Sequence, residues 1–497
     1  VQIPAVQRKL ADGAAHYIEN KLHTKVEIER IRFRSVNKLE LRNVYLADQA
    51  GDTLFKANRV AAGMQLLPML RKQYKVSSVQ LFSFDLRLRK ATAEAPLNIQ
   101  PLIDAFRSDE EKKKEPVEIR ISNVRLHSGR ISYDVEDQEP LSDRLDANHI
   151  AIEDLAGKLH FGKLKNEDLD LSVKRFRFKE KSGLEIVELS FDLAANPEQM
   201  RIDQLVLKLP DSRLNLKDFE ANYESYDRII DETTTLSVGI DFPRIDLNDL
   251  DAILPDLSVL GKNVAIEGHV NGTLNELRVD EISFKEEYGS FLRGSLSVKN
   301  LFSKESPIYV SAGVKNSLFR KAYLKRLAIA DELGRVGDIT FSGALSGYLS
   351  ELTAVGNIGT DIGNLTADFK FGQQADYFFN GHVASQGFGL GSLLNNPDLG
   401  RIVFDIDMNS VWKDKTSYSA KLTAQVPLIE YQGHAYDEIK IDGLLTNGSY
   451  EGVFSMDGAK GQLLAQGSVV LQDANSEFRL LVDGEGVNFD GFRFTRN

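Results

Sequence analysis

The stretch 25–46 constrains the fold of this chain more than any other feature of the sequence. Apolar side chains recur at every second position in two runs, with charged or polar residues between them. Because successive side chains of a β-strand point to opposite faces, each run predicts a strand with one apolar and one polar face. Each run also holds a three-residue step, from Ile28 to Ile31 and from Leu41 to Val44. Such a step keeps the apolar residues on one face only if an extra residue bulges out, so we expect two bulged amphipathic strands.

The same pattern recurs along the chain. Three-residue steps interrupt the segments 119–126, 171–178 and 202–207, whereas 82–88, 131–135, 189–193 and 236–242 alternate without a break. The unbroken alternation places Phe82, Phe84, Leu86 and Leu88 on one face, with Asp85 on the other.

A single hydrophobic core stops growing at about 250–300 residues, and this chain has 497. Serial one-faced strands in such a chain favour an elongated arrangement in which each strand contacts only its neighbours. We therefore predict a mainly β fold: an elongated, twisted, U-shaped β-groove of repeated amphipathic antiparallel strands. Helical spacing of apolar residues predicts short helices at 4–22, 64–72, 98–106 and 246–254.

Glycines mark the second half of the chain, since eight of the 37 precede residue 260. Gly268 and Gly272 recur 75 residues later as Gly343 and Gly347, each pair followed by the same Glu-Leu dipeptide. Glycines inside strands usually mark bulges or close backbone approaches. We expect these four structural glycines at points of curvature, where a Cβ would crowd a neighbouring strand.

The composition excludes several classes of function. A net charge of −12 argues against a nucleic-acid partner, and the absence of cysteine removes disulfides, thiolate metal sites and a cysteine nucleophile. The eight histidines form no ligand pair at helical or strand spacing, and no phosphate-binding or nucleophile motif occurs. The sequence therefore predicts no enzyme, no metal site and no cofactor.

The apolar face of the strands is the remaining candidate site. In a closed sandwich this face would be core, and in a curved open trough it would be a long hydrophobic track. Sequence periodicity leaves both arrangements open. For the trough, we predict these lining residues: Ile28, Phe33, Leu41, Phe82, Phe84, Leu86, Leu88, Ile121, Ile131, Tyr133, Phe176, Phe191, Val238, Ile240, Ile266 and Phe341.

Four segments resemble the TamB family of the AsmA-like superfamily. They are VQIPAVQRKLADGAAHYIENKLHTKVEIERIRF (1–33), NIQPLIDAF (98–106), FGLGSLLNNPDLGRIVFDIDMN (388–409) and YQGHAYDEIKIDGLLTNGSYEGVFSMD (431–457). None of them is a catalytic motif, and their common order along the chain makes the resemblance more specific than any single match.

The resemblance implies an envelope protein of Gram-negative bacteria, located in the periplasm and anchored to the inner membrane. Its groove would conduct phospholipid to the outer membrane. The alternative is a scaffold that assembles outer-membrane β-proteins with a barrel partner of the Omp85 type. On this view, 1–23 is an amphipathic helix that follows a membrane anchor, 24–259 is a first groove segment and 260–497 a second, glycine-marked one. The anchor and the family's C-terminal domain lie outside this sequence.

Overall fold

The computed structural model describes most of the chain. The described residues are 4–35, 37–64, 74–106, 117–141, 144–162, 168–254, 262–301, 303, 306–326, 335–373, 375–413, 417–459, 461–470 and 477–486. Within them the chain is mainly β, with 25 strands and a few short helices. The prediction of a mainly β chain of serial, mostly antiparallel strands is therefore confirmed.

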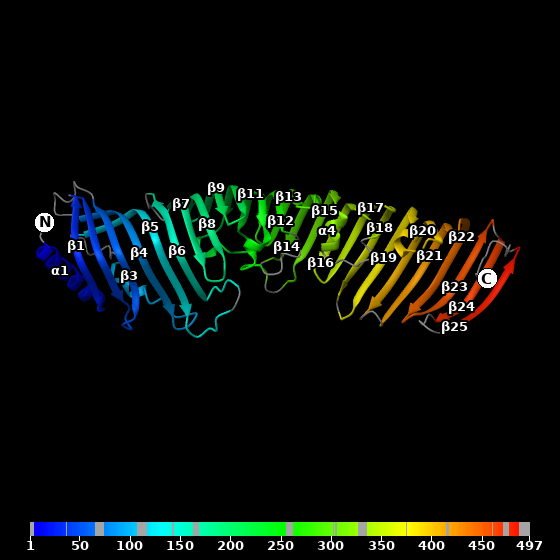
Figure 1. Ribbon diagram of the computed structural model, residues 1–497, viewed down its shortest axis with the longest axis horizontal. Helices are drawn as coiled ribbons and strands as arrows, with labels where there is room; N and C mark the ends of the chain where they lie inside the picture. Colours follow the sequence, from blue (N-terminus) through cyan, green and yellow to red (C-terminus); the bar gives the residue numbers. More distant parts are fainter. Residues whose placement is uncertain are drawn as a thin grey trace. The chain divides into compact units, whose positions relative to one another are not determined.

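The chain divides into two compact units. The first consists mainly of Val1–Ile229 and Ser237–Ser258, and the second mainly of Ala265–Asn497. In each unit the strands follow one another side by side in chain order (Figure 1).

The first unit begins with a helix and continues as a strand ladder. Its elements are α1 (Pro4–Leu22), β1 (Val26–Ser35), β2 (Lys38–Ala47), β3 (Thr53–Met64), β4 (Tyr74–Lys90), α3 (Gln100–Phe106), β5 (Val117–Val135), β6 (His149–Phe161), β7 (Leu169–Glu180), β8 (Glu185–Asn196), β9 (Gln199–Lys208), β10 (Arg213–Asn222), the 3₁₀ helix η1 (Tyr226–Arg228), β11 (Thr235–Asp246) and the 3₁₀ helix η2 (Leu247–Leu250).

The second unit is a longer ladder of the same kind. Its elements are β12 (Asn263–Thr273), β13 (Glu276–Glu286), β14 (Phe291–Lys299), β15 (Tyr309–Leu318), α4 (Lys321–Arg326), β16 (Ile339–Tyr348), β17 (Glu351–Thr360), β18 (Gly363–Gln373), β19 (Tyr377–Gly389), α5 (Leu390–Leu394), β20 (Leu399–Trp412), β21 (Tyr418–Tyr431), β22 (His434–Thr446), β23 (Ser449–Gly458), β24 (Gly461–Val470) and β25 (Glu477–Glu485).

Each strand from β1 to β9, and each from β13 to β24, pairs with the next strand in the chain. All these pairs are antiparallel except β4 with β5, which is parallel. A parallel pair needs a long crossover connection, and α3 lies in this one. This parallel pair is the exception among the predicted antiparallel strands.

The helix predictions have mixed outcomes. The helices at 4–22 and 98–106 are confirmed as α1 and α3, whereas 246–254 contains only the short η2. Of the segment 64–72, Met64 ends β3 and the remaining residues lie outside the described part of the chain. The short helices α4 and α5 were not predicted.

A line of kinks crosses the strands of the first unit. Asn43 has a φ of 46° and lies opposite Glu29, because the pairs Ile28–Val44 and Arg30–Arg42 keep one register. The three-residue steps of β1 and β2 therefore face each other. Neither strand has an extra residue at this step, so the prediction of a bulge there was wrong; the register of the pair shifts only further on, between Phe33 and Ser35.

The kink continues into the next strands. Ser83 of β4 (φ 47°) and Ser128 of β5 (φ 53°) share a register position, and Asp154 of β6 and Arg175 of β7 also adopt positive φ. A residue in this conformation interrupts the extended backbone and changes which face the following side chains occupy. The apolar side chains on both sides of the kink line thus remain on one face.

Helices cover one end of this apolar face. Ala11, Ala15 and Leu22 of α1 are buried with Val26 and Ile28 of β1 in one cluster. Partly buried side chains of α3 and of β2–β4 pack against the same cluster. Helix α1 thus covers the apolar surface at the first strands.

Candidate functional site

One face of the first unit is apolar across all ten strands of the ladder. A single row of cross-strand neighbours, one per strand from β1 to β10, defines this first apolar face. Its members are Phe33, Leu39, Ala62, Val79, Val124, Leu159, Val173, Phe191, Leu205 and Leu216. At about 4.8 Å per strand, nine steps make an uninterrupted apolar row of about 43 Å.

The second unit repeats this arrangement over thirteen strands. One row of neighbours from β13 to β25 defines the second apolar face, and every member is apolar or glycine. Its members are Val279, Leu296, Ala312, Leu345, Ala354, Phe369, Gly381, Met408, Leu422, Gly443, Gly452, Gly467 and Leu480. Twelve steps give a row of about 58 Å.

Hydroxyl groups on the second apolar face are satisfied internally. Ser317, Ser385 and Ser410 are buried, and their hydroxyls donate to backbone carbonyls at 2.8, 2.7 and 2.9 Å. A buried hydroxyl that is already hydrogen-bonded adds little polarity to its surface. These serines therefore leave the face effectively apolar.

Phe84 is placed as the sequence predicted. It pairs with Ala57 on the apolar side and is 4% exposed, in a cluster with Ala57 and Leu155. Its ring lies over Gly129, where an added Cβ would overlap the ring. Gly157 has the same relation to Phe176. A glycine on one strand thus makes room for a phenylalanine on its neighbour.

Phe82 lies on the opposite, polar face, which corrects the prediction for this strand. The positive φ of Ser83 breaks the alternation, so Phe82 pairs with Arg59 and His127 instead of an apolar residue. The Arg59 guanidinium lies 3.6 Å from the centre of the Phe82 ring, and the imidazole of His127 stacks on it at 4.4 Å. Burial, together with nearby Arg125 and Arg59, lowers the pKa of His127.

The other predicted lining residues differ in how far they are covered. Ile28, Leu41, Leu86 and Leu88 belong to the cluster under α1 and α3, so helices already occupy that part of the face. Phe33 and Ile121 are 41% and 37% exposed. Val238 is buried, and the rest are half-buried: Ile131, Tyr133, Phe176, Phe191, Ile240, Ile266 and Phe341.

The four predicted glycines lie close to neighbouring backbone or side chains. Gly272 (φ 125°) and Gly347 (φ 142°) occupy equivalent strand ends, and an added Cβ would overlap the carbonyl oxygen of Glu276 or Glu351. A Cβ on Gly343 would overlap the backbone of β17, whereas one on Gly268 would lie 3.0 Å from the side chain of Val279.

Buried carboxylates in the first unit hold turns. The Asp48 side chain accepts from the amides of Ala50 and Asp52, each at 3.0 Å, and pairs with Arg89 at 2.7 Å. Burial alone would raise the pKa of Asp48, but the hydrogen bonds from Asn98 and Arg89 outweigh burial and hold it below its usual range. Glu180, at the end of β7, likewise accepts from backbone amides. These acids serve as structural caps.

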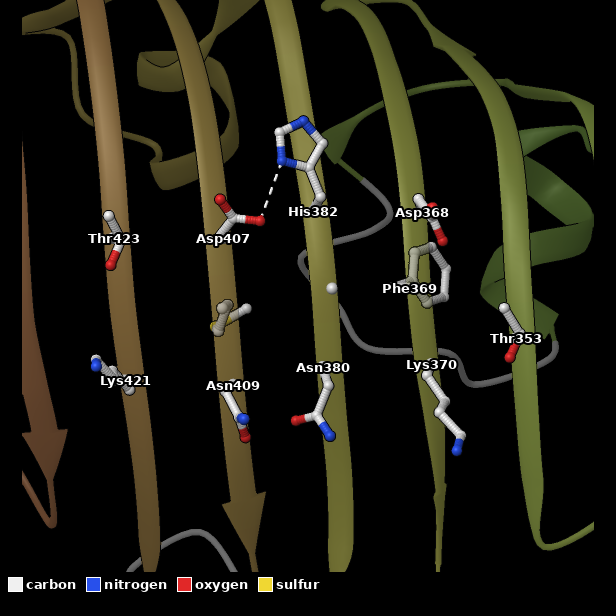
Figure 2. A pocket seen from close by; sticks show the side chains of 12 residues that line it. Thr353, Asp368, Phe369, Lys370, Asn380, His382, Asp407, Asn409, Lys421 and Thr423 are labelled. Atoms are coloured by element: carbon white, nitrogen blue, oxygen red, sulfur yellow. Dashed lines mark hydrogen bonds and ion pairs between the residues drawn. The ribbon is translucent and has the colours of Figure 1, made fainter.

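A polar depression of about 490 Å³ lies on the polar face of the second unit, opposite the second apolar face. Figure 2 shows two rows of polar side chains crossing β18–β21 there, on either side of Gly381. One row contains Asp368, His382, Asp407 and Thr423, which are successive cross-strand neighbours. Sequence reasoning missed this site because its residues come from four strands whose register no spacing reveals.

Comparison of the chain with protein-family models, with curated proteins and with solved structures finds no match in any of the three. Among the described helices, none is both long and apolar enough to cross a membrane. The two apolar faces and the polar depression are thus the surface features that bear on function.

Proposed function

We propose that the two apolar faces hold phospholipid acyl chains, and that this chain is a periplasmic groove protein of the TamB type that passes phospholipid between the inner and outer membranes. The observation that carries the proposal is the pair of cross-strand rows without a charged residue, through ten strands and through thirteen. The family resemblance extends it to an inner-membrane anchor and an Omp85-type partner.

The energetics favour a long row over a local pocket. Transferring one CH₂ group out of water is worth about 0.8 kcal/mol, so an acyl chain of about 16 carbons needs about 13 kcal/mol of apolar burial at each point of its path. A local pocket supplies this burial at one place only. A row that stays apolar from strand to strand buries an acyl chain to a similar extent at each successive position.

The exposure of the second apolar face supports an open surface over a packed core. Within each unit the described strands form a single layer, and no second sheet packs on it. Central members of the row such as Leu345 and Leu422 are only half-buried although their strands are paired on both sides. A sandwich core would bury such residues almost completely.

Glutamate substitution at Leu345 tests the proposal. Leu345 is part of the row, whereas the preceding residue, Ala344, points to the opposite face and is exposed. Leu345→Glu introduces a charge that an acyl chain could pass only by desolvating it, at a cost of several kcal/mol. Ala344→Glu is the matched control, because it adds the same charge to the same strand on the other face.

The measurement is the phospholipid that co-purifies with each variant, quantified by native mass spectrometry, together with circular dichroism of the fold. We expect lipid in the wild type and in Ala344→Glu, and little in a folded Leu345→Glu. Equal lipid in both folded variants would refute the assignment of this face. A lipid-free wild type that binds outer-membrane β-strand peptides would favour the assembly scaffold instead.

A further inference from the structure

Three potential metal ligands meet at the polar depression of the second unit, which His382 and Asp407 line and beside which Asp405 lies. His382 lies on β19, and Asp405 and Asp407 lie two residues apart on the same face of β20. The His382 Nδ1 is 3.2 Å from a carboxylate oxygen of Asp407 and 3.5 Å from one of Asp405. All three donor atoms lie within 4.8 Å of one another. In Figure 2 the imidazole of His382 points toward Asp407 on the adjacent strand.

The strand ladder fixes this arrangement. His382 pairs directly with Asp407, and Asp405 pairs with Ala384 on the same strand as His382. Residues two apart on a strand share a face, so the two carboxylates flank the imidazole without any loop having to move. A site built on paired strands is held more precisely than one built on loops.

Among the described residues no lysine or arginine pairs with the two aspartates, although Lys370 and Lys421 also line the depression. Within the described residues, neither Asp405 nor Asp407 has a hydrogen-bond or ion-pair partner other than His382. Asp368, the neighbour of His382 on β18, adds a third carboxylate. Like charges on adjacent positions of a sheet destabilise it, and a bound cation would remove this repulsion.

We propose that His382, Asp405 and Asp407 bind a divalent transition-metal ion of the zinc type. Zinc ligands at about 2.0–2.2 Å in tetrahedral geometry lie about 3.3–3.5 Å apart, which matches the two His–Asp separations. A nitrogen donor with two carboxylates favours zinc over calcium or magnesium, which prefer oxygen alone. The depression leaves room for water at the fourth position, and the ion links β19 to β20.

The test is a titration of the untagged full chain after removal of metals with a chelator. Calorimetry with Zn²⁺ should show one saturable site per chain, and Co²⁺ should give the intense visible absorption of a tetrahedral complex. We expect His382→Ala and Asp407→Asn each to weaken Zn²⁺ binding by at least about tenfold, since the first removes a ligand and the second replaces an anionic ligand with a neutral amide.

Two variants serve as controls because they remove similar groups elsewhere. His160→Ala deletes an exposed histidine of β6, and Asp442→Asn removes a carboxylate two strands from Asp407. Both should bind Zn²⁺ like the wild type. The proposal fails if His382→Ala binds Zn²⁺ as tightly as the wild type, if the wild type has no saturable site, or if Ca²⁺ competes equally with Zn²⁺.

Discussion

The side-chain placement on β4 leads to a prediction that separates Phe84 from Phe82. Phe84 is 4% exposed, and its ring fills the space beside Gly129. If the ring is removed, Gly129 has no side chain that could fill this space. Phe→Ala changes in cores cost about 3–5 kcal/mol, and we expect Phe84→Ala to cost about 4 kcal/mol of local stability. The cost arises from lost apolar burial and from the cavity that remains.

Phe82→Ala should cost much less. Its ring is half-buried on the polar face, where it interacts with Arg59 and stacks on His127. A cation–π contact contributes about 0.5–1 kcal/mol and an aromatic stack about 0.5–1.5 kcal/mol, so we expect a total near 2 kcal/mol.

The assay is native-state hydrogen exchange followed by mass spectrometry, because a chain of two compact units is not expected to unfold in one step. Phe84→Ala should accelerate exchange in β3–β6, and Phe82→Ala should do so to a smaller extent. If Phe82→Ala destabilises these strands as much as Phe84→Ala does, the kink at Ser83 does not separate the two faces and this reasoning is refuted.

Three further predictions concern single positions. Gly343→Val should accelerate hydrogen exchange in β16–β18 and leave the first unit unchanged, since its Cβ would overlap the Val355 carbonyl oxygen. Gly13→Ala should raise the stability of α1 by about 0.5–1 kcal/mol in thermal unfolding, because an added Cβ meets no atom there. Asp48→Asn should cost about 2 kcal/mol at pH 7, because it weakens the charged hydrogen bond to Arg89, which keeps Asp52 as a partner. The folded pKa of Asp48 is lowered, so its stabilisation is complete above the unfolded pKa of about 3.9 and is lost as the pH falls through the folded pKa. The difference from Asp48→Asn in pH-dependent unfolding should therefore shrink below about pH 4.

Alternation in the sequence predicted the apolar face wherever a three-residue step marked the kink. The steps at Ile28 and Leu41 can be recognised in the sequence, because the apolar residues before and after each step would otherwise lie on different faces. The kink at Ser83 is hidden, since Phe82 and Phe84 read as one regular alternation while the neighbouring strands hold Ser83 in positive φ. Tertiary pairing here overrides the local pattern.

Features that depend on the register between strands could not be predicted from the sequence either. The parallel pairing of β4 with β5 follows from the crossover that includes α3, and neither strand's own pattern distinguishes parallel from antiparallel neighbours. His382 and Asp407 are 25 residues apart, and only the pairing of β19 with β20 brings them together. Short helices such as α5, with five residues, carry too little periodicity to be recognised.

Site-specific photocrosslinking along β21 tests the central claim most directly. A benzophenone side chain at Ala420 or Leu422 lies on the second apolar face, and one at Lys421 or Thr423 lies on the polar face. With the purified chain and phospholipid, we expect crosslinks to phospholipid at Ala420 and Leu422 and none at Lys421 and Thr423, which is a period of two residues. Crosslinks of equal yield at all four positions, or at Lys421 and Thr423 alone, would contradict it.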